Sequence, residues 1–416
     1  FISETVFTSI RIKVLIEYLL IHIPNDSTSK LIKNSDNKKI YYSENNSYFL
    51  CLIFSTLFLT NNFLEKILFS PKEIAKKILC QDDFDFNNII FDALSFLLNE
   101  NLVDIQIFAD NLSAQFTKLD KSIKKIITKY QNSNEQINNE DLDIICNRYS
   151  FPQFLFKNIY FSNFNKYSVQ EIINLAESLM KAAPLNIRVN SILSKTNKVL
   201  SYFQNQNINC GKSRLSPNGI TIYSRIFLND NDLFKNGIIE IQDDASQVVA
   251  FAFEANKHNS ILDACAGAGG KSLHLAAINE DSCSIISSDI EFNKLKELEK
   301  RAKRAGFKSI KTKLLKPKDF EKENFNPYNT MFDAILIDAP CSGTGTVRRS
   351  PMLKYQLDEK QLKKKTDVQL KLINYFSKFL RPDGILVYST CSILPQENEE
   401  IISKFLAVSQ DFKPDY

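Results

Sequence analysis

The spacing of apolar residues divides the chain into a helical first part and a mixed second part. Apolar positions recur at helical intervals up to about residue 130, for example in Ile89–Leu98 and Ile123–Ile127. Ser70, Pro71 and Glu73 form a helix-start signal with a capping box. A polar stretch, Gln131–Asp141, then predicts a linker. The pattern predicts an all-helical domain over residues 1–135.

A second capping box, Ser168 and Glu171, predicts a helix that ends near Ala182, before Pro184. An extended segment follows, and short strands then alternate with helices to about residue 236. This pattern predicts a small α+β subdomain over residues 146–235. From 236 to 416 the alternation of strand and helix is regular, which predicts an α/β domain with a parallel sheet and helices on both faces.

The composition fits an ordinary globular protein: 44% of the 416 residues are hydrophobic and 24% are charged. It excludes a mostly disordered or collagen-like chain. The longest apolar run, Tyr48–Thr60, is shorter than the roughly 20 residues that span a bilayer. No signal peptide is recognisable, and the eight cysteines contain no CxxC pair. We therefore expect a cytoplasmic protein without a disulfide framework, a metal site or a membrane partner.

Charge is unevenly distributed along the chain, whose net charge is +4. Residues 1–150 carry 16 Lys and Arg against 19 Asp and Glu, whereas residues 294–318 carry 11 basic residues and two acidic ones. Such a basic block is either the solvated face of a helix or a surface that attracts phosphates.

A glycine-rich loop separates a predicted buried strand, 260–264, from a predicted helix, 272–278. The loop residues are Cys265, Ala266, Gly267, Ala268, Gly269, Gly270 and Lys271. Glycines allow a ligand to approach the backbone, and a helix N-terminus favours anionic groups. The spacing fits neither a P-loop nor a GxGxxG fingerprint, because Cys265 and Ser272 stand where those motifs need glycine. The next strand ends at Asp289, whose carboxylate can accept hydrogen bonds from ribose hydroxyls. The segment therefore predicts a nucleoside cofactor.

Two cysteines follow the last two predicted strands, in Asp338-Ala339-Pro340-Cys341 and in Ser389-Thr390-Cys391-Ser392. The carboxyl ends of parallel strands share one edge of a sheet, so Asp338, Cys341 and Cys391 should meet the glycine loop. A thiol there suits methylation of a pyrimidine carbon. A thiolate that adds to C6 of cytosine makes C5 nucleophilic, and loss of the C5 proton with the thiol completes the cycle. Lys271 could supply the positive charge that favours a thiolate.

At these residues the chain resembles the Sun/RsmB family of S-adenosylmethionine-dependent RNA (cytosine-5)-methyltransferases. The resemblance runs from about Phe151 to Gln396 and includes Arg188-Val189-Asn190, Phe234–Ala250, the glycine loop and both cysteine motifs. It implies a Rossmann-like class I methyltransferase domain over 236–416. It also implies a ferredoxin-like RNA-binding subdomain before that domain, and a NusB-like RNA-binding domain over 1–135.

The resemblance further implies a role for each site residue. Cys391 would be the nucleophile, Cys341 would assist release of the product, and Asp338 would lie near both the target base and the cofactor. S-adenosylmethionine would be bound by residues 265–271, Asp289 and Asp338, with Asp319 as a candidate for the adenine side. Ala268 stands where the family usually has proline, and the chain stops before the terminal strands that the family normally carries, so we expect a truncated catalytic domain.

Arg188, Asn190, Arg348 and Arg349 are the predicted RNA contacts, with surface ion pairs as the alternative for the last two. A cytosine must be unpaired or flipped out to reach a thiol. The sequence thus predicts a monomeric enzyme that methylates C5 of a cytosine in RNA, with 16S rRNA as the favoured substrate. The alternatives are the same reaction on tRNA and a non-catalytic RNA-binding protein of ribosome assembly; a DNA cytosine methyltransferase is disfavoured by the order of the motifs.

Overall fold

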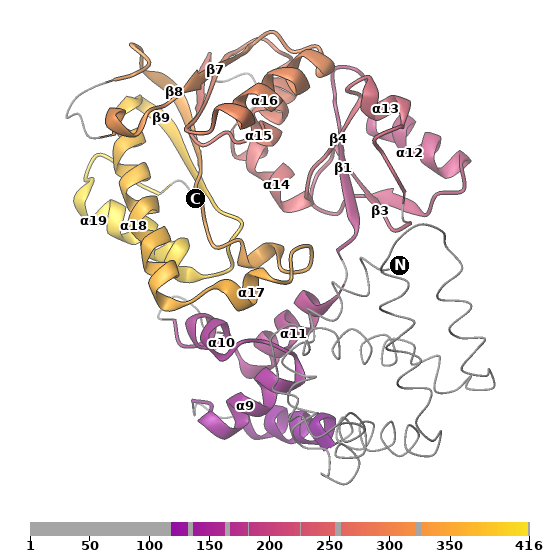
Figure 1. Cartoon of the computed structure of the whole chain (residues 1–416), viewed down its shortest axis with the longest axis vertical. Helices are drawn as coiled ribbons and strands as arrows, with labels where there is room; N and C mark the ends of the chain where they lie inside the picture. Colours follow the sequence, from indigo (N-terminus) through magenta and orange to yellow (C-terminus); the bar gives the residue numbers. More distant parts are fainter. Residues whose placement is uncertain are drawn as a thin grey trace, which may run out of the picture. The chain divides into compact units, whose positions relative to one another are not determined.

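The computed structural model describes residues 118–131, 136–162, 167–181, 183–224, 226–253, 259–320 and 326–414. The capping box at Ser70 and the apolar run Tyr48–Thr60 lie outside these residues. Of the domain predicted over 1–135, only residues 118–131 are described. The chain forms two compact units (Figure 1). One contains the described residues up to 181 together with Val347–Gln356, and the other contains Ala183–Thr346 with Leu357–Tyr416.

The first unit is helical in the residues that the structure describes. It contains a helix over 118–130, α9 (Asn139–Arg148), α10 (Gln153–Tyr160), α11 (Val169–Met180) and α17 (Leu353–Gln356). The capping box predicted before α11 is confirmed: Glu171 N donates to Ser168 Oγ at 3.3 Å, and Ser168 N donates to the Glu171 carboxylate at 2.8 Å. Lys354 Nζ donates to Ser150 O at 2.5 Å, which ties α17 to the turn after α9.

The second unit begins with a four-stranded antiparallel sheet of order β2-β3-β1-β4. Its elements are β1 (Leu185–Val189), α12 (Thr196–Asn205), β2 (Cys210–Lys212), β3 (Gly219–Ile222), α13 (Asp232–Lys235) and β4 (Ile239–Ile241). The antiparallel α+β region is therefore confirmed. Its sheet starts at Leu185 and ends at Ile241, whereas the sequence placed the subdomain at 146–235; residues up to 181 group instead with the helical unit.

A five-stranded parallel sheet of order β7-β6-β5-β8-β9 follows. Its strands are β5 (Ser260–Asp263), β6 (Ser284–Asp289), β7 (Ile310–Leu314), β8 (Phe332–Asp338) and β9 (Leu380–Ser389). The helices are α14 (Asp244–Val248), α15 (Gly270–Ile278), α16 (Phe292–Ala305), α18 (Glu359–Phe376) and α19 (Glu399–Val408), with short 3-10 turns at 249–252, 317–319, 344–346, 377–379 and 395–397. The predicted α/β domain with a parallel sheet is confirmed.

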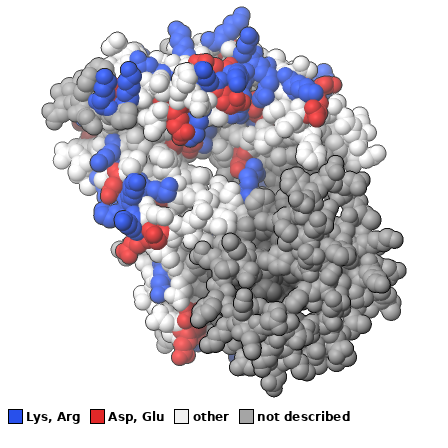
Figure 2. Space-filling view, in the orientation of Figure 1, with Lys and Arg blue, Asp and Glu red and all other residues white. Residues whose placement is uncertain are grey.

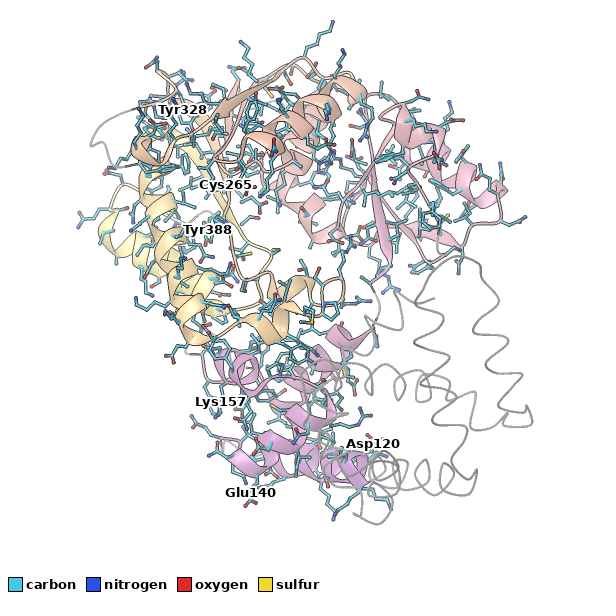
Figure 3. All side chains as sticks on the ribbon, in the orientation of Figure 1. Asp120, Glu140, Lys157, Cys265, Tyr328 and Tyr388 are labelled. Atoms are coloured by element: carbon cyan, nitrogen blue, oxygen red, sulfur yellow. The ribbon has the colours of Figure 1, made fainter. Side chains whose placement is uncertain are left out.

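The central strands bury both faces, because successive side chains of a strand point to opposite sides. In β5, Ile261 joins the core formed with α15 and α16, and its neighbour Leu262 joins the core formed with α18 and α19. In β8, Leu336 joins the core formed with α15 and α16, and Ile337 joins the core formed with α18 and α19. Side chains fill both sides of the sheet (Figure 3), so helices cover each face as the sequence predicted.

The strand order fixes where a ligand would bind. From β5 the chain builds outward through β6 and β7, then returns to the other side of β5 to form β8 and β9. Open α/β sheets bind ligands beyond the carboxyl ends of their strands at such a reversal. The glycine loop, Asp338 and both cysteine motifs follow the carboxyl ends of β5, β8 and β9.

Candidate active site

The glycine loop joins β5 to α15 through two residues with left-handed backbone conformations. Gly269 has φ +86°, and a Cβ there would lie 2.3 Å from Leu298 Cγ of α16, so only glycine fits. Gly267 has φ +55°, and a Cβ there would meet nothing within 4 Å. Its amide donates to Asp289 Oδ2 at 2.8 Å, while Glu291 N donates to Asp289 Oδ1 at 2.9 Å. The loop backbone is therefore open on one side and anchored by Asp289.

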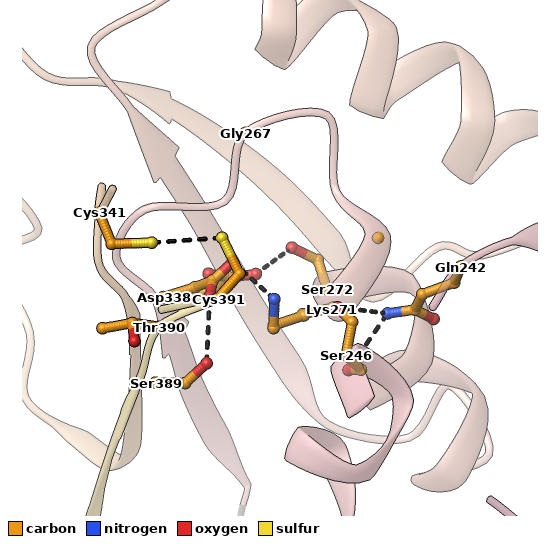
Figure 4. Close-up of polar contacts among 12 residues, drawn as sticks. Gln242, Ser246, Gly267, Lys271, Ser272, Asp338, Cys341, Ser389, Thr390 and Cys391 are labelled. Carbon is orange, nitrogen blue, oxygen red and sulfur yellow. Dashed lines mark hydrogen bonds and ion pairs between the residues drawn. The ribbon is translucent and has the colours of Figure 1, made fainter. Parts of the chain in front are cut away.

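Asp338, at the end of β8, is held by two donors. Lys271 Nζ lies 2.6 Å from Asp338 Oδ2 in a largely buried ion pair, and Ser389 Oγ donates to Asp338 Oδ1 at 3.1 Å (Figure 4). The Asp338 side chain remains 31% exposed. The predicted meeting of Lys271 and Asp338 at the edge of the sheet is thus observed, and the carboxylate can still receive donors from a ligand.

The two cysteine side chains meet by their sulfur atoms. Cys341 Sγ and Cys391 Sγ are 3.2 Å apart (Figure 4), with Cys391 exposed and Cys341 partly buried. The thiol of Cys341 donates to Cys391, and this hydrogen bond is the main cause that lowers the pKa of Cys391 to about 7. Burial and Asp338 oppose the shift, whereas Lys271 favours it. The hydrogen bond to Cys391, with burial, raises the pKa of Cys341 well above its ordinary value. The pair therefore favours a thiolate on Cys391 over one on Cys341.

This arrangement predicts that Cys391 reacts with iodoacetamide at neutral pH. Its pKa is lowered, so the thiolate accumulates as the pH rises through about 7, and alkylation should follow that titration. Quantitative mass spectrometry of the Cys391 peptide between pH 5 and 9 measures the midpoint, with the partly buried Cys210 as the slow control. A midpoint at or above about 8.5, the ordinary thiol value, would contradict the thiolate assignment.

Asp263 is a buried carboxyl group just before the glycine loop that the sequence analysis did not single out. It ends β5, is fully buried, and accepts a hydrogen bond from Ser272 Oγ at 2.6 Å. Burial raises the pKa of Asp263 to about 7. Its position directly before the glycine loop, at the end of a buried strand, was the signal that could have identified it.

The prediction that Arg188 and Asn190 contact RNA is wrong. Arg188 is 2% exposed, and its guanidinium donates to the Gln242 side chain and to Gly270 O, the latter at 2.6 Å. Asn190 is 4% exposed and donates to Ala305 O at 3.2 Å. The reason is that β1 and the residue after it are buried on both sides. Ile187 and Val189 enter the core of their own sheet, and Arg188 and Asn190 bond to helices α15 and α16 of the parallel-sheet region. Arg188 thus supports the glycine loop through Gly270 O, and Asn190 holds the end of α16 through Ala305 O.

Part of the basic block 294–318 is likewise internal. Arg301 pairs with the buried Glu240 of β4 at 3.0 Å and donates to Ala268 O at 2.6 Å, and Arg304 also pairs with Glu240. The exposed lysines of α16 and β7 gather with acidic residues along the edge of the molecule where these elements lie (Figure 2). The block is thus divided between a solvated face and ion pairs that support the glycine loop.

The remaining candidates are Arg348, Arg349 and Asp319. Arg348 Nε donates to Lys181 O at 3.3 Å within the helical unit, and Arg348 and Arg349 are both partly exposed; their RNA contacts stay predictions. Asp319 Oδ2 accepts from Lys316 N at 2.9 Å and so closes its own turn. In the part of the chain that the structure describes, no group of three or more His, Cys, Asp and Glu could hold a metal. None of the described helices is long and apolar enough to cross a membrane.

The chain is similar in sequence and in fold to several known proteins. Residues 250–415 match the family model described as 16S rRNA methyltransferase RsmB/F. The ribosomal RNA small subunit methyltransferase B of Shewanella oneidensis is 32% identical over 248 residues, which cover 59% of this chain and 55% of that protein. A methyltransferase homolog protein from Pyrococcus horikoshii is 25% identical, with a TM-score of 0.55 over 65% of this chain and 83% of that structure. The crystal structure of PH0851 has a TM-score of 0.59 at 21% identity and covers 98% of this chain and 90% of its own.

The chain spans about half the length of the curated relatives it matches. The matched segment contains the parallel sheet, the glycine loop and both cysteine motifs.

Proposed function

Because residues 250–415 of this chain match the family model of the RsmB/F methyltransferases, we propose that the protein transfers a methyl group from S-adenosylmethionine to C5 of a cytosine in RNA, with 16S rRNA as substrate. The observation that carries the proposal is the 3.2 Å contact between Cys341 Sγ and Cys391 Sγ at the carboxyl edge of the sheet. One thiolate and one protonated thiol side by side suit addition to a pyrimidine ring followed by elimination.

The described residues fit the cofactor. The open backbone face at Gly267 leaves room for a ligand, and Asp289, at the end of β6, offers carboxylate oxygens to ribose hydroxyls. Cys265–Lys271 would line the cofactor, and Asp338 would accept from its cationic amino group. When bound, S-adenosylmethionine supplies an electrophilic methyl group.

The chain's own residues account for the rest of the cycle. The Cys391 thiolate adds to C6 of the cytosine, which raises electron density at C5. Asp338 can accept a hydrogen bond from the exocyclic amine of the base. Once Cys391 is bonded to carbon it no longer carries the negative charge that raises the pKa of Cys341. Cys341 can then lose its thiol proton to solvent. The Cys341 thiolate accepts the C5 proton, the electrons of the C5–H bond re-form the C5=C6 double bond, and the C6–sulfur bond breaks to return the Cys391 thiolate.

The domain assignments belong to the same proposal. The element order β1-α12-β2-β3-α13-β4 in an antiparallel sheet supports a ferredoxin-like RNA-binding subdomain. We also propose a NusB-like RNA-binding domain over 1–135, a monomeric state and a cytoplasmic location. The six cysteines in the described residues are all free thiols, which fits that location.

Replacing Asp289 by asparagine should weaken S-adenosylmethionine binding by about 10- to 100-fold, since a hydrogen bond to a charged group contributes about 1.5–3 kcal/mol. Isothermal titration calorimetry measures the effect. Asp319→Asn is the matched control: it should leave affinity unchanged, because Asp319 closes the turn at Lys316. Equal loss in both variants would instead place Asp319 at the adenine side.

The proposed reaction is tested by incubating the protein with methyl-labelled S-adenosylmethionine and protein-free small-subunit rRNA, in parallel with total tRNA. We expect label in 5-methylcytidine at one rRNA position. Label on tRNA alone would support the same reaction with tRNA, in place of rRNA, as the substrate. Absence of label on both RNAs, with the cofactor still bound, would favour a non-catalytic RNA-binding role.

A further inference from the structure

A buried glutamate lies beneath the loop that carries Cys341. Glu397 is fully buried, lies six residues after Cys391 and ends the 3-10 turn Pro395–Glu397. Its carboxylate accepts from Ser342 N at 2.8 Å and also from Ser342 Oγ. A third donor, Gln369 Nε2, lies 3.0 Å from Glu397 Oε1. A buried carboxylate with three directed donors holds its neighbours in one geometry.

The same pair of side chains fixes the peptide on both sides of Cys341. Gln369, on α18 and fully buried, donates to Pro340 O at 3.0 Å, directly before the cysteine. Glu397 holds the amide of Ser342, directly after it. Cys341 is therefore placed by hydrogen bonds to its two neighbours in the chain.

Further contacts join this loop to the loop of Cys391. Ser392 Oγ lies 3.2 Å from Ser342 Oγ and 3.0 Å from Thr344 Oγ1. Gly345 N donates to Cys391 O at 2.9 Å, and a Cβ on Gly345 would lie 2.8 Å from that oxygen. The distance between the two sulfur atoms is thus set by the fit of two loops that meet above Glu397.

We propose that Glu397 is a positioning residue, which holds Cys341 within hydrogen-bond distance of Cys391. The effect of Glu397 on turnover rests on the function proposed above, whereas its effect on the position of Cys341 does not. The groups that face the Cys391 sulfur are Cys341, Asp338 and Lys271, and of these only Cys341 depends on Glu397 for its place. If Cys341 moves away, Cys391 loses the donor that contributes most to its low pKa.

The test is Glu397→Gln, which keeps the shape but replaces one acceptor oxygen with an NH₂ group that cannot accept from Ser342. We expect the pH midpoint of Cys391 alkylation to rise by about one unit, so that alkylation at pH 6 slows by roughly tenfold. Glu399→Gln, the same change at an exposed residue two positions along, should leave the midpoint unchanged.

Thermal unfolding and cofactor binding establish that the variant is folded. If Glu397→Gln does not fold, Gln369→Met provides a second variant: it removes the donors to Pro340 O and Glu397 but leaves the carboxylate and Ser342 in place, and it should shift the midpoint in the same direction. On RNA, folded variants should show a lower kcat with unchanged KM for RNA and cofactor.

An unchanged alkylation midpoint in both folded variants would overturn the positioning role. This outcome is distinct from failure of the proposed function. If the wild-type protein methylates no RNA but the pH midpoint of Cys391 alkylation still shifts in Glu397→Gln, the positioning role is supported and the proposed reaction is wrong.

Discussion

Replacing Cys391 by alanine is expected to abolish methyl transfer while the protein still binds S-adenosylmethionine. In the proposed mechanism the thiolate of Cys391 makes C5 of cytosine nucleophilic, whereas the hydrogen bonds of the Gly267 amide and the Ala268 carbonyl in the glycine loop are made with Asp289 and Arg301. Loss of a catalytic nucleophile lowers turnover by at least about three orders of magnitude. Label incorporation into RNA and calorimetric cofactor binding, measured on the same preparation, check both halves of the expectation.

Cys210→Ala is the matched control, since Cys210 is a partly exposed thiol on β2, in the antiparallel sheet. It should retain full activity. Turnover by Cys391→Ala within tenfold of the wild type would exclude Cys391 as the nucleophile.

Replacing Cys341 by alanine should instead trap the protein on its RNA. In the proposed mechanism Cys391 can still add to the base, but the neighbouring thiol that would assist release is gone. Because Cys341 donates to Cys391, its removal should also raise the pKa of Cys391, so the adduct should form more slowly at neutral pH and then persist. Denaturing gel electrophoresis with end-labelled RNA detects a protein–RNA species that resists denaturant.

The double variant Cys341→Ala with Cys391→Ala separates this explanation from tight non-covalent binding, because it should form no such species. If Cys341→Ala releases methylated RNA at the wild-type rate, Cys341 has no role in release.

Local sequence patterns predicted the elements that carry the site. The strand before Cys265, the strand that ends at Asp289 and the two strands that precede the cysteine motifs are all present. Each is a short apolar run bounded by turn residues, and a parallel sheet brings the carboxyl ends of its strands to one edge. The neighbourhood of Lys271, Asp338, Cys341 and Cys391 could therefore be predicted before any distance was known.

Side chains that act through distant partners could not be predicted in this way. Arg188 resembled a surface RNA contact, yet its partner is the carbonyl of Gly270, 82 residues along the chain. Glu397 is part of a polar run in the sequence, and only the packing of α18 against the turn at 395–397 buries it beside Gln369. Pairings of this kind depend on tertiary packing, which hydrophobic periodicity does not encode.

The central claim is that Cys391 forms the bond to the RNA base. It is tested most directly with small-subunit rRNA transcribed with 5-fluorocytidine and incubated with the protein and S-adenosylmethionine. Fluorine at C5 cannot leave as a cation as a proton does, so the methylated adduct cannot eliminate its sulfur. Nuclease and protease digestion followed by mass spectrometry then identifies the modified peptide. We expect a methylated fluorocytidine attached to Cys391. Attachment to Cys341, or no attachment while unmodified RNA is still methylated, would exclude Cys391 as the residue that bonds to the base.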